Sequence, residues 1–104
     1  MLNDLTASML GKPSIVTASC CVCGRPATNQ HHVIIKGMGG TRHEKRIPTV
    51  SLCGLGNTSG CHKLAHAMRL HFRYTDTWEY IILPKPTNYA DALECEGWCK
   101  CYGC

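Results

Sequence analysis

The sequence lacks several features that would assign a chain to a large class of proteins. No apolar run approaches the ~20 residues that a membrane-spanning helix needs. The first ten residues have neither the basic region nor the long apolar stretch of a secretory signal. No internal repeat or low-complexity tract is present. We therefore expect no membrane segment and a location in the reducing environment of the cytoplasm.

Acidic residues are scarce in the middle of the chain. Between residues 12 and 74, Glu44 is the single acid, against nine Lys and Arg. The other acids lie near the two ends, so the formal net charge of the whole chain is only +4. A basic segment of this kind is typical of a protein that binds a polyanion.

The length of 104 residues excludes a second independent core, and so small a domain often needs covalent or metal cross-links to fold. The chain has nine cysteines and six histidines. In a reducing compartment, an odd number of cysteines beside histidines favours bound zinc over disulfide bonds.

The residue pattern predicts a small α+β domain. Residues 31–35 and 49–52 are rich in β-branched side chains and predict two short strands that pair across a glycine-rich basic loop, residues 36–46. A turn-rich segment then leads into a helix predicted over residues 61–70. The centre of the chain is therefore predicted to fold as ββα.

Further elements are predicted after this centre. Residues 71–74 and 78–83 favour strands, and residues 88–96 favour a short helix that ends at Gly97. The predicted organisation has three parts: a flexible N-terminal arm over residues 1–18, a core over residues 19–72, and a β/α extension with a cysteine-rich tail over residues 73–104.

Four cysteines have a spacing that predicts a structural zinc site. Cys20-x2-Cys23 is the spacing of a zinc knuckle, and Cys53 with Cys61 completes four thiolates if the hairpin folds back over it. Cys21 is a rival to Cys20 as the first ligand, but its separation from Cys23 is short for two ligands of one ion.

A second cysteine cluster lies in the last ten residues. It is either a second zinc site or a metal-free, oxidisable tail. Its members are Cys95, Cys99, Cys101 and Cys104.

The histidines predict a second metal site. His62 and His66 stand four residues apart on the predicted helix, so both rings project from one face and can chelate one cation. The adjacent pair His31 and His32 can supply a third ligand. Neighbouring strand residues point to opposite sides, so the other imidazole is left free to take a proton from water. Surface roles are expected for the two remaining histidines, His43 and His71.

The order of these motifs resembles one nuclease family. The matching strings are Cys20-x2-Cys23, His31-His-Val-Ile, Gly39-Gly40, Val50-Ser-Leu-Cys53 and Cys61-His-x3-His66. Over residues 20–70 the chain is similar to the zinc-containing, phage-type branch of the HNH endonucleases, and residues 71–98 resemble the same proteins more loosely. The resemblance implies a ββα-metal, treble-clef-like core around the four-cysteine zinc.

The resemblance also implies roles for single residues. His32 would be the general base, and His31, His62 and His66 would hold a catalytic divalent ion such as Mg²⁺ or Mn²⁺. Many members carry an Asn that fixes the loop at the position of Pro48; here Asn57 is either its substitute or a turn former. The residues that would contact DNA phosphates are Lys36, Arg42, Lys45, Arg46 and Lys63.

The implied activity is hydrolysis of DNA phosphodiester bonds with low sequence specificity, leaving 5′-phosphate and 3′-hydroxyl ends. The implied setting is the cytoplasm of a bacterial host, with DNA and a phage packaging terminase as partners. The alternative function is that of a zinc-stabilised DNA-binding protein without catalysis. The adjacent pair His31 and His32 favours the nuclease, since a binding protein needs no free imidazole beside a metal ligand.

Overall fold

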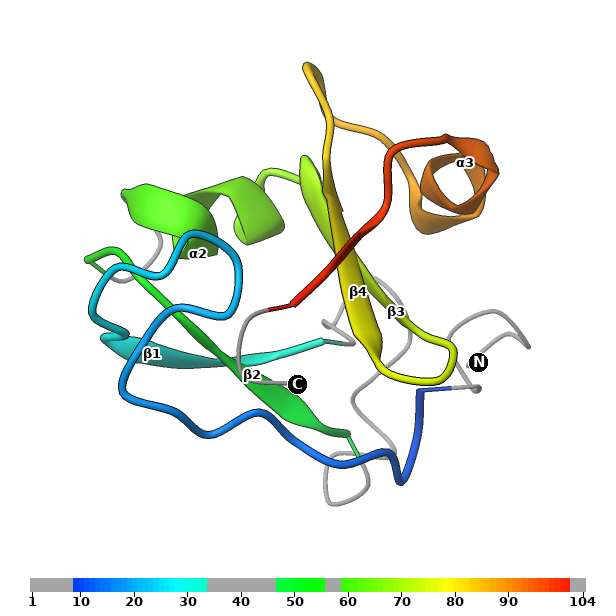
Figure 1. Ribbon diagram of the computed structural model, residues 1–104. Coiled ribbons are helices and arrows are strands. Elements are labelled where there is room, and N and C mark those ends of the chain that lie inside the picture. The colour runs from blue at the N-terminus through cyan, green and yellow to red at the C-terminus, as the bar shows by residue number, and fades with distance from the viewer. Residues whose placement is uncertain (1–8, 34–46, 56–58, 102–104) are drawn as a thin grey trace.

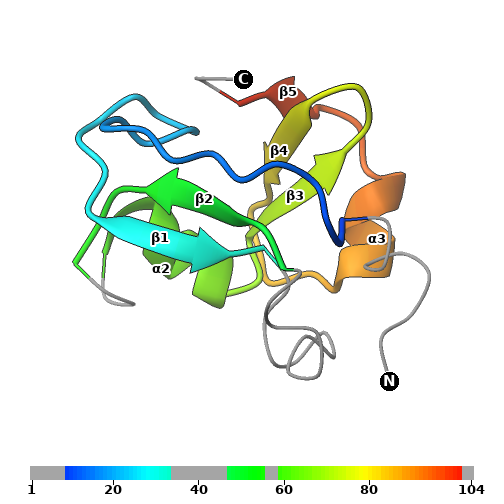
Figure 2. The ribbon, with the colours of Figure 1, turned by 90° about the horizontal axis from the view of Figure 1, so that it is seen from below.

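The computed structural model describes residues 9–33, 47–55 and 59–101, which form two antiparallel sheets and two short helices (Figures 1 and 2). One sheet pairs β1 with β2, and the other has the order β3, β4, β5. The bounds in chain order are β1 (Asn29–His32), β2 (Thr49–Leu52), α2 (Gly60–His66), β3 (Leu70–Tyr74), β4 (Trp78–Ile82), α3 (Tyr89–Glu94) and β5 (Cys99–Lys100). No helix among these residues is long and apolar enough to cross a membrane.

The first two strands pair as predicted, but β1 begins at Asn29, two residues before the predicted strand over residues 31–35, and ends at His32; residues 34 and 35 lie outside the described part. His31 lies opposite Val50 and His32 lies opposite Thr49 in the antiparallel register. The alternation of the strand turns His31 into the core and leaves His32 exposed. The predicted basic loop over residues 36–46 lies outside the described residues.

The helix α2 is shorter than predicted. It starts after the N-cap residue Ser59, but it ends at His66 and not at Leu70. Met68 adopts a left-handed φ of 61°. The N–H groups of Met68 and Arg69 donate to the carbonyls of Ala65 (3.2 Å) and Leu64 (3.0 Å), which is the Schellman pattern of a helix terminus. This turn frees Leu70 to begin β3.

The second sheet follows directly from this turn. β3 and β4 form a hairpin at the two segments that favour strands, with β3 beginning one residue earlier than predicted, at Leu70, and α3 lies within the segment that favours a helix. The Asn88 side chain caps α3 by accepting from the N–H of Asp91 at 2.8 Å. The sequence did not predict β5, which pairs with Glu79 and Tyr80 of β4.

The N-terminal segment is packed, so the expectation of a flexible arm is wrong for residues 9–18. The side chains of Met9 and Ile15 are buried in the core, and Ile15 forms a parallel bridge to Val50 of β2. The Trp78 indole N–H donates to the carbonyl of Pro13. In Figure 2 this segment runs from the β-hairpin to the second sheet. Met9 and Ile15 are single apolar residues without helical or strand periodicity, so the sequence did not indicate that they are packed. Residues 1–8 lie outside the described part.

His71 is buried, which corrects the expected surface role. Its Nε2 lies 2.9 Å from the carbonyl oxygen of Met68, to which the N–H of Thr87 also donates at 2.9 Å. The neutral ring with its proton on Nε2 therefore donates to the turn that ends α2. The second expected surface residue, His43, lies outside the described residues.

The packing of the N-terminal segment predicts an asymmetry between two substitutions. Met9→Ala removes a side chain that is 0% exposed, so we expect it to lower the free energy of unfolding by about 2–3 kcal/mol. Val16→Ala changes a side chain that is 74% exposed, so we expect a change below about 0.5 kcal/mol. Urea unfolding monitored by circular dichroism measures both. Equal effects of the two substitutions would contradict the packing.

The burial of His71 predicts a pH-dependent contribution to stability. Burial lowers the pKa of His71 below its ordinary value of 6.5, although the backbone oxygens of Met68 and Thr87 act to raise it. Below about pH 6.5 the unfolded chain binds more protons than the folded chain, so the contribution of neutral His71 is present above that pH and is lost as the pH falls. We therefore expect the destabilisation by His71→Gln, measured by urea unfolding, to be smaller at about pH 5.5 than at about pH 7.5.

Leu70→Ala is the control for this measurement, because Leu70 is buried on the same strand and has no titratable group. Its effect should be the same at both pH values. A His71→Gln effect that is equally constant would show that the buried ring does not resist protonation.

Candidate metal centres

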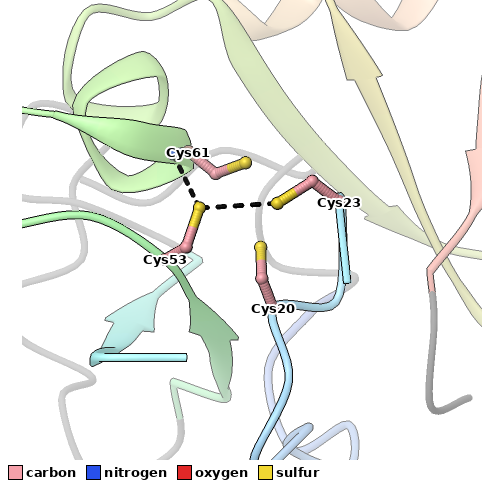
Figure 3. Close-up of side chains that lie close together, drawn as sticks. All are labelled: Cys20, Cys23, Cys53 and Cys61. Carbon is pink, nitrogen blue, oxygen red and sulfur yellow. Dashed lines mark hydrogen bonds between the residues drawn. The ribbon is translucent and has the colours of Figure 1, made fainter. Parts of the chain in front are cut away.

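Four cysteines from three separate segments converge on one point (Figure 3). Cys20 and Cys23 lie on the turn before β1, Cys53 directly follows β2, and Cys61 lies in the first turn of α2. Their sulfur atoms all lie within 4.8 Å of one another, and the Cys23 and Cys53 sulfurs are 3.5 Å apart. Tetrahedral zinc with bonds of about 2.3 Å places its sulfurs about 3.8 Å apart. The group could therefore hold a zinc ion.

Two glycines bring Cys61 back to Cys53 across seven intervening residues. Gly54 and Gly60 both have positive φ, 120° and 66°. A Cβ on Gly54 would lie 2.0 Å from the carbonyl oxygen of Ser59, and one on Gly60 would lie 2.7 Å from that of Cys53. The ends of the loop thus approach more closely than any side chain allows.

The backbone around Cys20 favours its thiolate. Burial acts to raise the pKa of Cys20, but hydrogen bonds from the backbone of Cys23, Val22 and Cys53 outweigh it and lower the pKa to about 7. Burial and the negative charge of Cys20 raise the pKa of Cys61. Burial also raises the pKa of Cys23. Four adjacent thiolates are therefore unfavourable without a cation, which the donor set is suited to bind.

Cys20, and not Cys21, belongs to this group. Cys21 is fully buried, and its N–H donates to the carbonyl of Ser51 at 2.9 Å. Its backbone therefore joins the knuckle to β2, while the sulfur of Cys20 lies with the other three.

Three histidines form a second group. His31 comes from β1, and His62 and His66 come from α2, with one nitrogen of each within 4.8 Å of the others. The Nε2 atoms of His62 and His66 are 3.1 Å apart, close to the roughly 3.4 Å that two nitrogens on one tetrahedral zinc would adopt. The ring centroid of His31 lies 5.1 Å from that of His62 and 5.3 Å from that of His66.

Burial favours the neutral form of two members of this group, His31 and His66. Burial, followed by the neighbouring charges of His62, His66 and His32, lowers the pKa of His31 to about 3. Burial and His62 lower the pKa of His66 as well. Neutral imidazole is the form that binds a metal, and three ligands leave coordination positions open. The residues therefore fit a cation with exchangeable positions.

His32 lies at the end of β1, outside this group. It is exposed, whereas His31 is buried. The structure therefore separates the adjacent pair into one inward and one outward imidazole.

The other predicted site residues have different outcomes. Lys63 is described and exposed on α2. Asn57 and four of the predicted DNA contacts lie outside the described residues: Lys36, Arg42, Lys45 and Arg46.

The tail cysteines do not form a metal group among the described residues. The sulfur of Cys95 donates to the carbonyl of Asp91 (3.4 Å), and that of Cys99 donates to the carbonyl of Gly97 (3.5 Å). Cys101 is buried, and Cys104 lies outside the described residues. The proposed second zinc therefore has no support from the three tail cysteines that are described.

Sequence reasoning missed the residue that anchors the loop of the cysteine group. The Asn29 side chain donates to the carbonyl of Gly54 at 2.7 Å, and the Thr28 hydroxyl donates to the same oxygen. Asn29 is the first residue of β1 and Thr28 directly precedes it, so they tie the hairpin to the loop between Cys53 and Cys61. A Thr-Asn pair is common in sequences and does not by itself indicate that it fixes a loop. On sequence alone, Asn57 was a candidate for that role.

Comparison of the chain with models of protein families, with curated proteins and with solved structures gave no match.

The convergence of four sulfurs predicts that Cys53→Ser releases zinc and unfolds the chain. Loss of one ligand leaves the remaining thiolates without a tetrahedral site, and the free energy of binding at a structural zinc site is also folding free energy. Native mass spectrometry should show one zinc fewer than in the wild type, and far-ultraviolet circular dichroism should show loss of structure. Cys99→Ser is the matched control at an exposed cysteine and should keep both. Unchanged metal content in Cys53→Ser would contradict the site.

Proposed function

We propose that the protein is a metal-dependent endonuclease that hydrolyses phosphodiester bonds of DNA on a core of the HNH, ββα-metal type. The observation that carries this proposal is the convergence of His31 with His62 and His66 beside an exposed neighbour, His32. A metal site built only for stability has no need of a further imidazole at its edge.

The order of elements supports the same proposal. An antiparallel hairpin is followed by a helix, and the two histidines of the helix meet the buried histidine of the first strand. The four-cysteine group lies at the start of the same helix. This order of elements accords with the ββα-metal core that the sequence resemblance implies.

In the proposed reaction, His32 takes a proton from the water that attacks the phosphorus. The exposure of His32 leaves its ring accessible to water and to a bound DNA strand. His31, His62 and His66 would hold a divalent ion, which when bound supplies positive charge to the phosphate and to the leaving oxygen. Neutral imidazoles add no negative charge of their own, so the site does not repel a phosphodiester.

The setting of this activity is proposed from the sequence. The basic middle of the chain suits DNA, and low specificity follows if the cations contact phosphates and not base edges. A cytoplasmic role beside a phage packaging terminase accords with the resemblance.

His32→Ala is expected to lower the rate of plasmid cleavage by about 10²–10⁴-fold, because it removes the proposed general base but none of the three proposed metal ligands. The assay follows the conversion of supercoiled plasmid to nicked and linear forms in a series of Mg²⁺, Mn²⁺, Ni²⁺ and Zn²⁺. Asp76→Ala is the control, because Asp76 is exposed in the turn between β3 and β4. Its rate should equal that of the wild type.

Two outcomes would overturn the proposal. Cleavage by His32→Ala at the wild-type rate would remove His32 from the mechanism. Binding of DNA without cleavage in any of the four metals would leave the zinc-stabilised DNA-binding protein as the function.

A further inference from the structure

A basic groove lies beside the four-cysteine group, and none of the histidines of the proposed nuclease site lines it. It is an open depression of ≈ 540 Å³. Three cations line it: Arg25 from the knuckle, Lys63 from α2, and Arg69 from the turn after α2. No acidic residue of the described part of the chain lines it, and its other lining residues are Cys23, Cys53, Ser59, Gly60, Cys61 and Leu64.

The three cations are available to a ligand. Arg25 and Lys63 are exposed. Among the described residues, the ion pair joins Arg73 to Glu79, and none of the three groove cations takes part in it. The Nε of Arg69 donates to the carbonyl of Leu83 at 3.0 Å. This bond orients the guanidinium of Arg69 and leaves its two terminal nitrogens as donors.

One rival explanation is charge compensation for the cysteines. Four thiolates around one Zn²⁺ would carry about two negative charges, which nearby cations would offset. However, the backbone supplies hydrogen bonds to two of these sulfurs: Val22 donates to Cys20 (3.5 Å), and Cys61 donates to Cys53 (3.4 Å). The long side chains of Arg25 and Lys63 are exposed to solvent, where their charges stabilise the centre only weakly.

We propose that this groove binds the phosphodiester backbone of DNA outside the point of cleavage. The inference rests on the proposed function for the identity of DNA as the ligand, and it adds Arg25 and Arg69 as contacts. Three cations without acids, placed along an open depression, match a chain of regularly spaced phosphates better than a single small anion.

The position of the groove relative to the histidine group sets where these contacts fall. Lys63 and Leu64 of α2 line the groove, whereas His62 and His66 of the same helix meet His31. Lys63 nevertheless precedes His66 by three residues, so the two side chains are neighbours on the helix surface, and the groove adjoins the histidine group along α2. The groove would therefore hold phosphates that flank the scissile bond.

The test compares two double variants that remove the same charge. Arg25→Gln/Lys63→Gln neutralises two groove cations, and Lys85→Gln/Lys100→Gln neutralises two exposed lysines that do not line the groove. Fluorescence anisotropy with a fluorescein-labelled duplex of about 20 base pairs, without added divalent ion, measures affinity between about 50 and 200 mM KCl. Each lost phosphate contact reduces the slope of log K against log [salt] by about 0.9.

We expect the groove variant to bind the duplex at least about tenfold more weakly at 100 mM KCl, with the slope reduced by about two. The control variant should keep its affinity within about twofold and keep its slope. Both variants should keep one zinc per four-cysteine group in native mass spectrometry and keep the wild-type thermal midpoint.

Three results would overturn the proposal that the groove binds DNA. The first is an equal effect of the two double variants on affinity, and the second is no duplex binding by the wild type at about 50 mM KCl. The third is zinc loss confined to the groove variant. The last result would assign the cations to the cysteine centre. Failure of the nuclease is distinguishable from failure of the groove. A wild type that binds the duplex through Arg25 and Lys63 but cuts no plasmid would retain the groove and overturn the nuclease.

Discussion

The convergence of four cysteine sulfurs within 4.8 Å of one another is the constraint on which the rest of the structure depends. A divalent cation at that point would offset the charge of their thiolate forms and join three segments: the knuckle, the end of β2 and the start of α2. His62 is the residue after Cys61, so fixing Cys61 also fixes the first histidine of the helix. His31 lies on the strand paired to β2. The geometry of the histidine group therefore follows from that of the cysteine group.

The second sheet packs against the elements that hold the histidine group. β3 begins four residues after α2 ends, and its Phe72 ring lies 6.4 Å from the ring of His31. His71 on the same strand holds the turn that ends α2. The boundary expected between residues 72 and 73 falls inside β3. β3 therefore packs against the histidine group through Phe72 and fixes the end of α2 through His71.

Sequence reasoning predicted both metal groups because ligand identity and spacing are local signals. Cys20-x2-Cys23 and His62-x3-His66 are visible without a structure, as is the pattern of two strands and a helix. Other features depend on contacts that are distant in the chain. The left-handed turn at Met68, the burial of Met9 and the bond from Asn29 to Gly54 join residues whose types carry no information about each other. His71 was misassigned for the same reason, since its partner is a backbone carbonyl.

The difference in burial between the two metal groups has a kinetic consequence. Cys20, Cys53 and Cys61 are buried, so an ion there would be shielded from water and competing ligands, except where Cys23 is exposed and the basic groove reaches the cysteines. His66 is exposed and is the last residue of α2, and helices fray first at their ends. An ion at the histidines would therefore exchange quickly with those in solution, while an ion at the cysteines would stay with the chain through purification. One protein would then contain a permanent metal and a replaceable one, with the medium deciding which element occupies the second.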